Sequence, residues 1–391
     1  MIFEQVKSEA QKLAPFIIDL RRKLHRIPEL GFKEKKTQKV LFNVLQEHGY
    51  VINTAARTGL FTFWEGTEKG KIVALRADMD GIPVQEETGL PYASEHPGIM
   101  HACGHDAHMA MLVGAAVILK NVSPQVKGSV LFIFQPAEET PPGGAKEMIS
   151  EGLLERTKPE AIFALHVNPF FPAGQLAVRP GPFMAAGDRF LLQVKGRGGH
   201  GAMPHKTVDP VYVASAVVQG LQQIIGRQIN PLEPAVISIG KICGGEEFNI
   251  IPSQVEITGT VRTLNHELRR SIPQKMEHLI RGITAAYGAD YSFEYEQGYP
   301  LLENERRMTE FMFNCAREFN SGHEPRLLDK PSTGSEDFAY FLERVPGSYA
   351  FFGVENGKTA FPLHSPEFQL NEEALPLGAA FLASLVVRYL I

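Results

Sequence analysis

The feature that most constrains this chain is a short run of metal-binding side chains. Residues 101–108 read His-Ala-Cys-Gly-His-Asp-Ala-His, which provides three imidazoles, a thiol and a carboxylate. These groups are the ligands that zinc and related divalent metals prefer in proteins. Cys103 and His105 are two residues apart, so in an extended or loop backbone their side chains can converge on one point. We therefore predict a metal site directly before the apolar segment 109–119, which reads as a buried helix. The alternative is a polar turn before a core helix.

Polar side chains also follow three apolar runs that have the character of buried strands. Near-continuous apolar runs are typical of strands that are covered on both faces of a sheet. The runs and the polar residues after them are 72–75 with Asp78 and Asp80, 129–134 with Glu138 and Glu139, and 161–165 with His166. Open α/β sheets bind their ligands at the carboxyl ends of such strands. We therefore expect these side chains to meet at one edge of a central sheet.

The pattern of the chain changes at about residue 183, where a second set of strands and helices begins. The expected elements are strand 190–195, helix 209–225, strands 235–240 and 255–262, helix 267–287 and strand 291–295. This order, strand-helix-strand-strand-helix-strand, is typical of a ferredoxin-like sandwich. We therefore predict an α/β fold in two parts. Residues 1–182 and 298–391 form a catalytic metal-binding domain with a central mixed sheet covered by helices, and residues 183–297 form an inserted ferredoxin-like α+β domain.

Charge and cysteine content indicate which partners and which compartment to expect. The formal net charge of -5 over 391 residues does not favour binding to nucleic acid or to an anionic membrane. Three cysteines, an odd number, do not make a disulfide framework. The first residues carry no basic region followed by an apolar core, so they do not resemble a signal peptide. We expect a cytoplasmic protein with no nucleic-acid and no membrane partner.

A set of motifs, in order along essentially the full chain, resembles the co-catalytic metallo-amidohydrolases. This family includes aminoacylase, hippurate hydrolase and the plant auxin-conjugate hydrolases, and related branches hold carboxypeptidases and succinyl-diaminopimelate desuccinylase. The motifs occupy residues 77–80, 101–106, 136–139, 199–204, 259–263, 334–338 and 364–366. Any one of them is a weak signal, but together and in this order they are specific. The resemblance implies a two-metal catalytic domain with an inserted dimerisation or lid domain.

The resemblance also implies which residues bind the metals. The implied ligands of two divalent ions per subunit, zinc, manganese, cobalt or nickel, are Cys103, His105, Glu139, His166 and His364. The peptidase branches have a ligand histidine where this chain has Asp78, which fits the amidohydrolase branch. Asp80 is then expected to position the metal ligands rather than to bind metal itself. His101 and His108 flank the motif and are expected to be non-ligands.

The adjacent residues Glu138 and Glu139 suit the hydrolysis of an amide. The amide carbonyl is a weak electrophile and water is a weak nucleophile, and a pair of metals activates both. A base that is not a ligand must then carry a proton to the leaving nitrogen. Following the family order, we expect Glu138 to be this proton shuttle. One alternative is a pair of exposed glutamates at a strand end. Another is a thiolate mechanism in which His105 activates Cys103, although nucleophilic cysteines work without such a cluster of carboxylates and imidazoles.

The predicted insert offers three further candidates. His200 lies in the glycine-rich loop 196–201, where it can approach a ligand closely, and is expected to stabilise the oxyanion of the tetrahedral intermediate. Arg262, at a strand end, suits bidentate capture of a substrate carboxylate, and Asn249 could help to hold it. The alternative is that all three are surface residues of a dimerisation domain. The resemblance implies a homodimer or a dimer of dimers, with His200 reaching the neighbouring subunit.

We therefore expect metal-dependent hydrolysis of N-acyl-L-amino acids, of the acetyl or benzoyl type, to a carboxylic acid and a free amino acid. A dipeptidase, a carboxypeptidase or an N-acetyl-diaminopimelate deacetylase would use the same two-metal mechanism. A non-catalytic metal- or peptide-binding protein is the alternative from another class. Glu138 counts against it, because a binding protein has no need of a proton shuttle.

Overall fold

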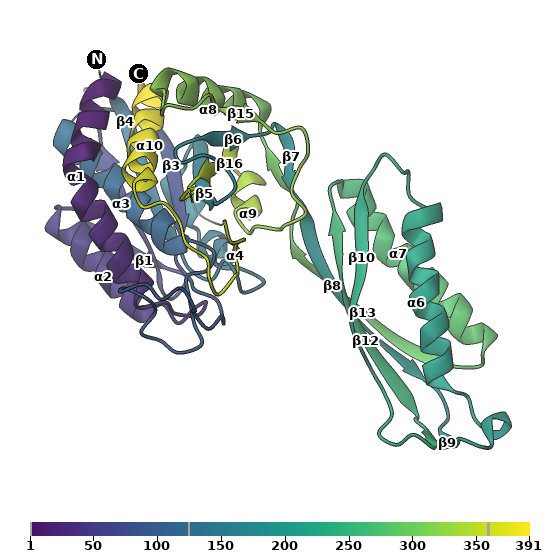
Figure 1. Ribbon diagram of the computed structural model, residues 1–391. Helices are drawn as coiled ribbons and strands as arrows, with labels where there is room; N and C mark the ends of the chain where they lie inside the picture. Colours follow the sequence, from purple (N-terminus) through teal and green to yellow (C-terminus); the bar gives the residue numbers. More distant parts are fainter. Residues whose placement is uncertain (1, 124–125, 358–359) are drawn as a thin grey trace. The chain divides into compact units, whose positions relative to one another are not determined.

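The computed structural model describes residues 2–123, 126–357 and 360–391, and they form two compact units (Figure 1). The first unit comprises Met1–Phe183, Glu303–Lys330 and Asp337–Ile391, and the second comprises Met184–Leu302 and Pro331–Glu336. The expected domain bounds, 1–182 with 298–391 and 183–297, stay a prediction, because compact packing is not evidence that either part folds independently. The α/β fold with an inserted α+β part is confirmed.

A mixed sheet forms the centre of the first unit. Its order among the described residues is β1 (Ile52–Ala55), β2 (Gly59–Glu65), β4 (Lys127–Gln135), β3 (Glu68–Asp78), β5 (Ala161–Asn168), β16 (Gly347–Gly353), β6 (Leu176–Val178) and β15 (Arg326–Leu327). The central strands β4, β3, β5 and β16 are parallel neighbours, whereas β2 and β6 flank them as antiparallel strands. Asp78 at the end of β3 is therefore aligned with Gln135 at the end of β4. The expected strand ends meet at one edge of the sheet.

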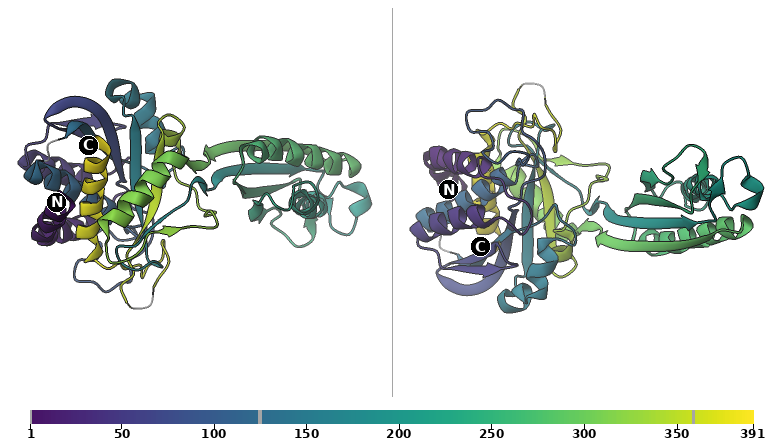
Figure 2. Two further views of the ribbon diagram at one scale, coloured as in Figure 1. Left: turned by 90° about the horizontal axis from the view of Figure 1, so that it is seen from above. Right: turned by 90° about the horizontal axis from the view of Figure 1, so that it is seen from below.

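Three long helices of the first unit share one apolar core. They are α1 (Ile2–His25), α3 (His105–Val122) and α10 (Ala374–Leu390), and α1 lies beside α10 (Figure 2). Residues 105–119 are buried on every side of α3, which explains why the segment has no polar stripe. The expected buried helix is confirmed, but it begins at His105. The other helices of this unit are α2 (Lys35–Glu47), α4 (Gly144–Ser150), α5 (Leu153–Thr157), α8 (Arg306–Phe319) and α9 (Ala339–Leu342).

The second unit has the expected ferredoxin-like order. Its main elements are β8 (Ala186–Lys195), α6 (Pro210–Arg227), β10 (Ala235–Cys243), β12 (Gln254–Thr263), α7 (His266–Ala286) and β13 (Asp290–Tyr299). The strands form an antiparallel sheet in the order β10-β12-β8-β13, and α6 and α7 pack on one face of it. Asp209 caps α6 and Asn265 caps α7, since each side chain accepts two backbone N–H bonds of the first turn.

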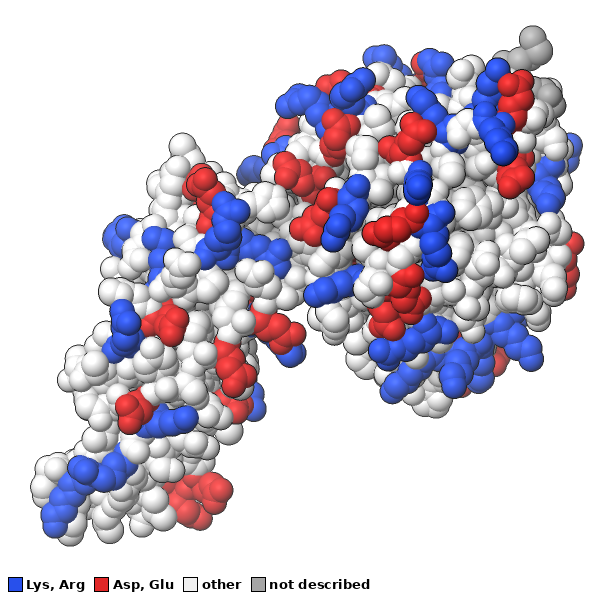
Figure 3. All heavy atoms as spheres, turned by 180° about the vertical axis from the view of Figure 1, so that it is seen from behind, with Lys and Arg blue, Asp and Glu red and all other residues white. Residues whose placement is uncertain are grey.

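Charged side chains of both signs are mixed over both units on the face drawn in Figure 3. The chain carries 39 Lys and Arg against 44 Asp and Glu, so such a mixture follows from a nearly balanced composition. Within residues 2–123, 126–357 and 360–391, no helix has both the length and the apolar character of a membrane span.

Candidate metal centre

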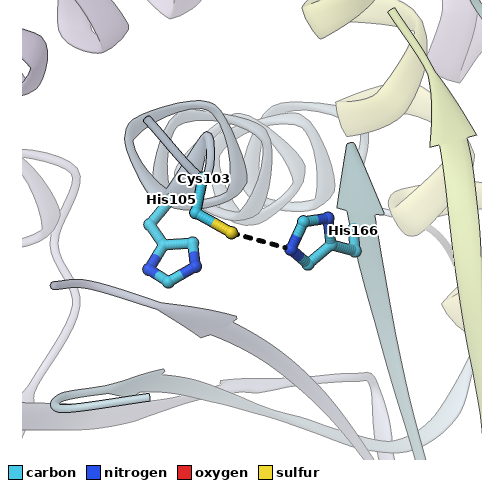
Figure 4. Close-up of side chains that lie close together, drawn as sticks. All are labelled: Cys103, His105 and His166. Atoms are coloured by element: carbon cyan, nitrogen blue, oxygen red, sulfur yellow. Dashed lines mark hydrogen bonds between the residues drawn. The ribbon is translucent and has the colours of Figure 1, made fainter. Parts of the chain in front are cut away.

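A left-handed turn at Gly104 brings Cys103 and His105 to one place. Gly104 has a φ of 84°, and a Cβ at this position would lie 2.4 Å from Cγ2 of Val167. Only glycine tolerates both the conformation and the close contact. The two side chains therefore converge because of this turn in the loop before α3. His105 follows the turn as the first residue of α3 (Figure 4).

His166 faces Cys103 from the neighbouring strand β5. The Cys103 thiol donates to Nε2 of His166 over 3.3 Å, and Nδ1 of His166 donates to the Val167 carbonyl over 2.8 Å (Figure 4). Burial lowers the pKa of His166 to about 3, so the ring is neutral with Nε2 unprotonated. A backbone bond that fixes the tautomer in this way is typical of metal-binding imidazoles. The strand continues to Asn168, so His166 lies inside β5 rather than after its end.

His364 and Glu139 meet on the other side of the Cys103 loop. Nε2 of His364 lies 3.0 Å from Oε1 of Glu139, and this hydrogen bond raises the pKa of His364. The backbone N–H of His364 donates to the Ala102 carbonyl over 2.9 Å. This bond holds the loop that carries His364 beside Ala102, the residue before Cys103.

The five predicted ligands fall into two overlapping groups. In each group, the candidate ligand atoms lie within 4.8 Å of one another. The first group is Cys103, His105 and His166, the second is Cys103, Glu139 and His364, and a further group joins His105 with Glu138 and Glu139. Cys103 belongs to both of the first two groups. The side chains of these groups would hold two divalent cations.

The surroundings of His105 fit a divalent cation. This imidazole is fully buried, and among the described residues its Nε2 has no hydrogen-bond partner. Burial alone would lower the pKa of His105, but the carboxylates of Asp78 and Asp80 outweigh it and raise that pKa to about 10. Burial and the charge of Glu139 hold the pKa of the Cys103 thiol well above its usual range. A divalent cation held here would stabilise the buried carboxylates and the thiolate form of Cys103.

Asp80 holds the two glutamates. Its Oδ1 accepts the backbone N–H of Glu138 and its Oδ2 accepts that of Glu139, both over 2.9 Å. Oδ1 also lies 3.3 Å from Nδ1 of His105. The side chain of Glu138 is almost fully buried, with 6% of the residue exposed, so a proton on it is shielded from bulk water. This geometry favours the supporting role expected for Asp80.

His108 and His101 are placed differently from the predicted ligands. Nδ1 of His108 donates to Oδ1 of Asp78 over 2.5 Å, and its Nε2 accepts the Val167 N–H over 2.9 Å. Both nitrogens of His108 are therefore engaged, which favours its non-ligand role even though it lies near Asp78 and His105. His101 is fully buried, and burial lowers its pKa to about 3. It belongs to none of the ligand groups found among the described residues.

The second unit holds His200 and Asn249 together. The short strands β9 (Gly199–His200) and β11 (Ile250–Ile251) pair, and the N–H of Gly201 donates to the Asn249 carbonyl over 2.8 Å. The side chain of His200 is exposed, and its Nδ1 accepts the N–H of Ala202 over 3.0 Å. The proton of a neutral His200 ring is therefore on Nε2, where it can be donated to an oxygen.

Arg262 lies elsewhere in the second unit, on β12. Its guanidinium is half buried and donates to the Thr260 hydroxyl and, over 3.2 Å, to the Val261 carbonyl. Burial lowers the pKa of Arg262, but a guanidinium stays charged in proteins. Both of these bonds are to residues of its own strand, and the carboxylate of Asp188 acts on the guanidinium through its charge.

A buried arginine behind the site was not anticipated. Arg76 on β3 donates to Asp78 over 2.6 Å, to Gln135 over 2.8 Å and to Asp337 over 3.0 Å. The signal was present, because a charged residue inside an apolar strand requires buried partners. Glu34, which accepts the backbone N–H of Ala137 over 2.9 Å, was also missed, and its segment carries no local signal for this contact.

The chain is similar to known proteins over most of its length. The model of Peptidase family M20/M25/M40 matches residues 74–388. An N-acetyl-L-cysteine deacetylase of Bacillus subtilis is 41% identical over 96% of this chain and 88% of its own. Thermostable carboxypeptidase 1 of Saccharolobus solfataricus is 37% identical over 99% of both chains. The crystal structure of the Bacillus subtilis YXEP protein, a dinuclear metal binding peptidase from the M20 family, has a TM-score of 0.84 at 35% identity, covering 97% of this chain and 99% of that one.

The fold and the cluster of ligand-type side chains are those of a metal-dependent hydrolase that acts on amide bonds. The chain belongs to Peptidase family M20/M25/M40.

Proposed function

We propose that this protein hydrolyses N-acyl-L-amino acids, of the acetyl or benzoyl type, with two divalent metal ions. The observation that carries the proposal is the pair of ligand groups that share Cys103, with the buried Glu138 beside them. The proposed ligands are Cys103, His105, Glu139, His166 and His364. The relative named as an N-acetyl-L-cysteine deacetylase supports an acyl amino acid as substrate. The donor set of thiolate, imidazole and carboxylate suits zinc, cobalt, nickel or manganese.

The side chains around the ions have separate tasks in this proposal. Divalent ions held here would polarise the substrate carbonyl and lower the pKa of a water molecule. Glu138 takes the proton of that water and passes it to the leaving nitrogen. Asp80 keeps Glu138 and Glu139 in place through their backbone N–H groups. The bond from His166 to the Val167 carbonyl keeps the proton on Nδ1, so that Nε2 has the lone pair that a metal ligand needs.

The second unit supplies substrate recognition in this proposal. His200 donates its Nε2 proton to the developing oxyanion, which is supported by the acceptor role of its Nδ1. Arg262 binds the carboxylate of the substrate, with Asn249 beside it. The protein acts in the cytoplasm as a homodimer, in which His200 of one subunit serves the metal site of the other.

A carboxypeptidase or dipeptidase activity is the second candidate. It would use the same ions and the same Glu138, and it differs in what lies on the acyl side of the amide bond. The relative named as a thermostable carboxypeptidase, which matches 99% of this chain, supports it. Deacetylation of N-acetyl-diaminopimelate is a variant of the first candidate activity, in which the amino acid part of the substrate is longer.

The test is a substrate screen on metal-stripped protein that is refilled with zinc, manganese, cobalt or nickel. The substrates are acetyl-methionine, benzoyl-glycine and matched dipeptides. We expect fastest turnover of an acetyl or benzoyl amino acid. Faster turnover of dipeptides would favour the carboxypeptidase, and binding of two metals without any turnover would identify a binding protein.

A further inference from the structure

Three consecutive backbone N–H groups of the turn that carries the paired glutamates end on buried carboxylates. The N–H groups of Glu138 and Glu139 donate to Asp80, and the N–H of Ala137 donates to Oε1 of Glu34 over 2.9 Å. Glu34 is 103 residues earlier in the chain and its relative exposure is 0%. Its other oxygen, Oε2, accepts the hydroxyl of Thr58 over 2.6 Å. The turn is therefore held by two carboxylates from separate segments.

Ala137 adopts a backbone conformation that requires such a hold. Its φ is 52°, in the left-handed region, which costs an L-residue other than glycine roughly 1–2 kcal/mol. The residue is fully buried, and the segment around Gly31 packs tightly on this turn. A Cβ added at Gly31 would lie 3.0 Å from the Cβ of Ala137 and 2.6 Å from Oγ1 of Thr140. A change at Ala137 therefore moves the next residue, Glu138.

A carboxylate is an expensive group to bury in this position. Burial raises the pKa of Glu34 to about 7, so its ionised form is disfavoured in the folded protein. An apolar side chain of similar size would avoid this cost, but it would leave the N–H of Ala137 buried without an acceptor. Oε1 of Glu34 therefore provides the acceptor for the N–H of Ala137, which an apolar side chain could not provide.

We propose that Glu34 is a positioning residue for Glu138 and Glu139. It acts through Ala137, whose N–H it binds, and together with Asp80 it sets the direction in which the two glutamates leave the strand β4. This inference rests on the proposed roles of Glu138 as proton shuttle and of Glu139 as metal ligand. In this proposal, Glu34 acts through Ala137 and contacts neither the substrate nor a metal ion.

Glu29 provides a matched control within the same segment. Its carboxylate accepts the N–H groups of Lys36 and Thr37, over 2.8 and 3.0 Å, and the Thr37 hydroxyl over 3.2 Å. These bonds stabilise the start of α2 and do not involve the turn of Ala137. Loss of the Glu29 side chain therefore removes a partly exposed carboxylate that accepts two backbone N–H groups, without changing the support of Glu138.

The experiment compares Glu34→Leu, Glu34→Gln and Glu29→Leu in the full-length protein. The measurements are the dissociation constants of both metal ions, the absorption spectrum of the cobalt form, kcat and KM, and the unfolding free energy. We expect Glu34→Leu to weaken the binding of one metal ion and to lower kcat by about 10- to 100-fold, with little change in KM. This range is typical of residues that position metal ligands. Glu34→Gln keeps an acceptor for Ala137 and should retain most of both properties.

Equal metal affinity and kcat in Glu34→Leu and Glu29→Leu at similar stability would overturn the inference. Should Glu34→Leu not fold, Glu34→Asp withdraws the carboxylate by one methylene and must show the same selective loss. The proposed function fails separately, when the wild-type protein turns over no acyl amino acid or dipeptide with any metal. In that case the metal affinities and the cobalt spectrum still decide whether Glu34 positions Glu139.

Discussion

At the scale of single residues, the absence of one Cβ at Gly104 decides whether the proposed ligands meet. Gly104→Ala combines a left-handed conformation with a contact of 2.4 Å to Val167. We expect the unfolding free energy to fall by roughly 2–5 kcal/mol, from strain of about 1–2 and overpacking of about 1–3, with loss of metal. Denaturant unfolding and elemental analysis measure both effects.

The control for this substitution is Gly181→Ala. Gly181 also has a positive φ, 75°, but an added Cβ would meet nothing within 4 Å. Only the conformational part of the cost, about 1–2 kcal/mol, should appear there. Similar losses for the two variants would mean that the contact with Val167 relaxes freely.

Glu138 is the second residue whose role can be isolated. Glu138→Gln preserves the shape of the side chain and the backbone N–H bond to Asp80, so it should still bind two metals. Turnover should fall by at least ~10²–10⁴, the usual contribution of a general base. Glu139→Gln is the contrast, because it should lose metal as well as activity. Near-normal turnover of Glu138→Gln at full metal content would place the proton shuttle elsewhere.

Glu34 should make the stability of the metal-free protein depend on pH. Its folded pKa of about 7 exceeds the usual 4.5, so between these values the folded state holds a proton that the unfolded state has lost. The resulting stabilisation is fully present below pH 4.5 and is lost as pH rises through 7. As the pH rises from 4.5 to 8, the unfolding free energy of Glu34→Gln should therefore increase by up to ~3 kcal/mol relative to that of the wild type. Denaturant unfolding at several pH values measures it, and a pH-independent difference would contradict it.

At the scale of elements, a buried ionic network joins α1, α3 and the segment before α10. Nε of Arg21 lies 2.7 Å from Oδ2 of Asp106, Nδ1 of His25 lies 2.7 Å from the same oxygen, and Nη1 of Arg21 lies 3.2 Å from Glu372. Arg21, His25 and Asp106 are almost fully buried. Asp106 follows His105, so the network holds the first turn of α3 where a proposed ligand begins it.

Arg21→Met should destabilise the protein by about 3–5 kcal/mol, because it leaves buried carboxylates without their main partner. The double variant Arg21→Met with Asp106→Asn should recover part of this loss, as the unpaired charge is removed. The control is Arg388→Met, which breaks an exposed pair with Glu318 and should cost less than about 1 kcal/mol. Denaturant unfolding of all three measures the effect, and a loss below that of the control would show that the network is dispensable.

At the scale of the whole molecule, the proposed dimer makes the site of one subunit depend on the other. Homodimers of Glu138→Gln and of His200→Ala should each be nearly inactive. After subunit exchange about half of the molecules are heterodimers, each with one complete site of two, so about a quarter of wild-type activity should return. Exchange is verified by tagging one chain and recovering the other with it. Proven exchange without recovered activity would rule out a shared site.

Local patterns in the sequence were sufficient to predict the elements and the class of chemistry. Continuous apolar runs identified β3, β4 and β5, and the order of elements identified the ferredoxin-like unit. The motif around Cys103 indicated a metal site, because the ability of a side chain to bind metal is a property of the residue type alone. The ends of the elements were less accurate, and short strands such as β1 and β6 were missed, because a few residues carry too little pattern.

The contacts that hold the proposed ligands and the proton shuttle in place could not be predicted from the sequence and became visible in the folded chain. The bonds of Asp80 and Glu34 to the turn at residues 137–139 span 58, 59 and 103 positions of the chain, and Arg76 reaches Asp337 across 261. A buried carboxylate or guanidinium must find partners, but the sequence does not say which ones. That choice follows from how the strands and loops pack, and packing is fixed by contacts between segments whose separation no local pattern records.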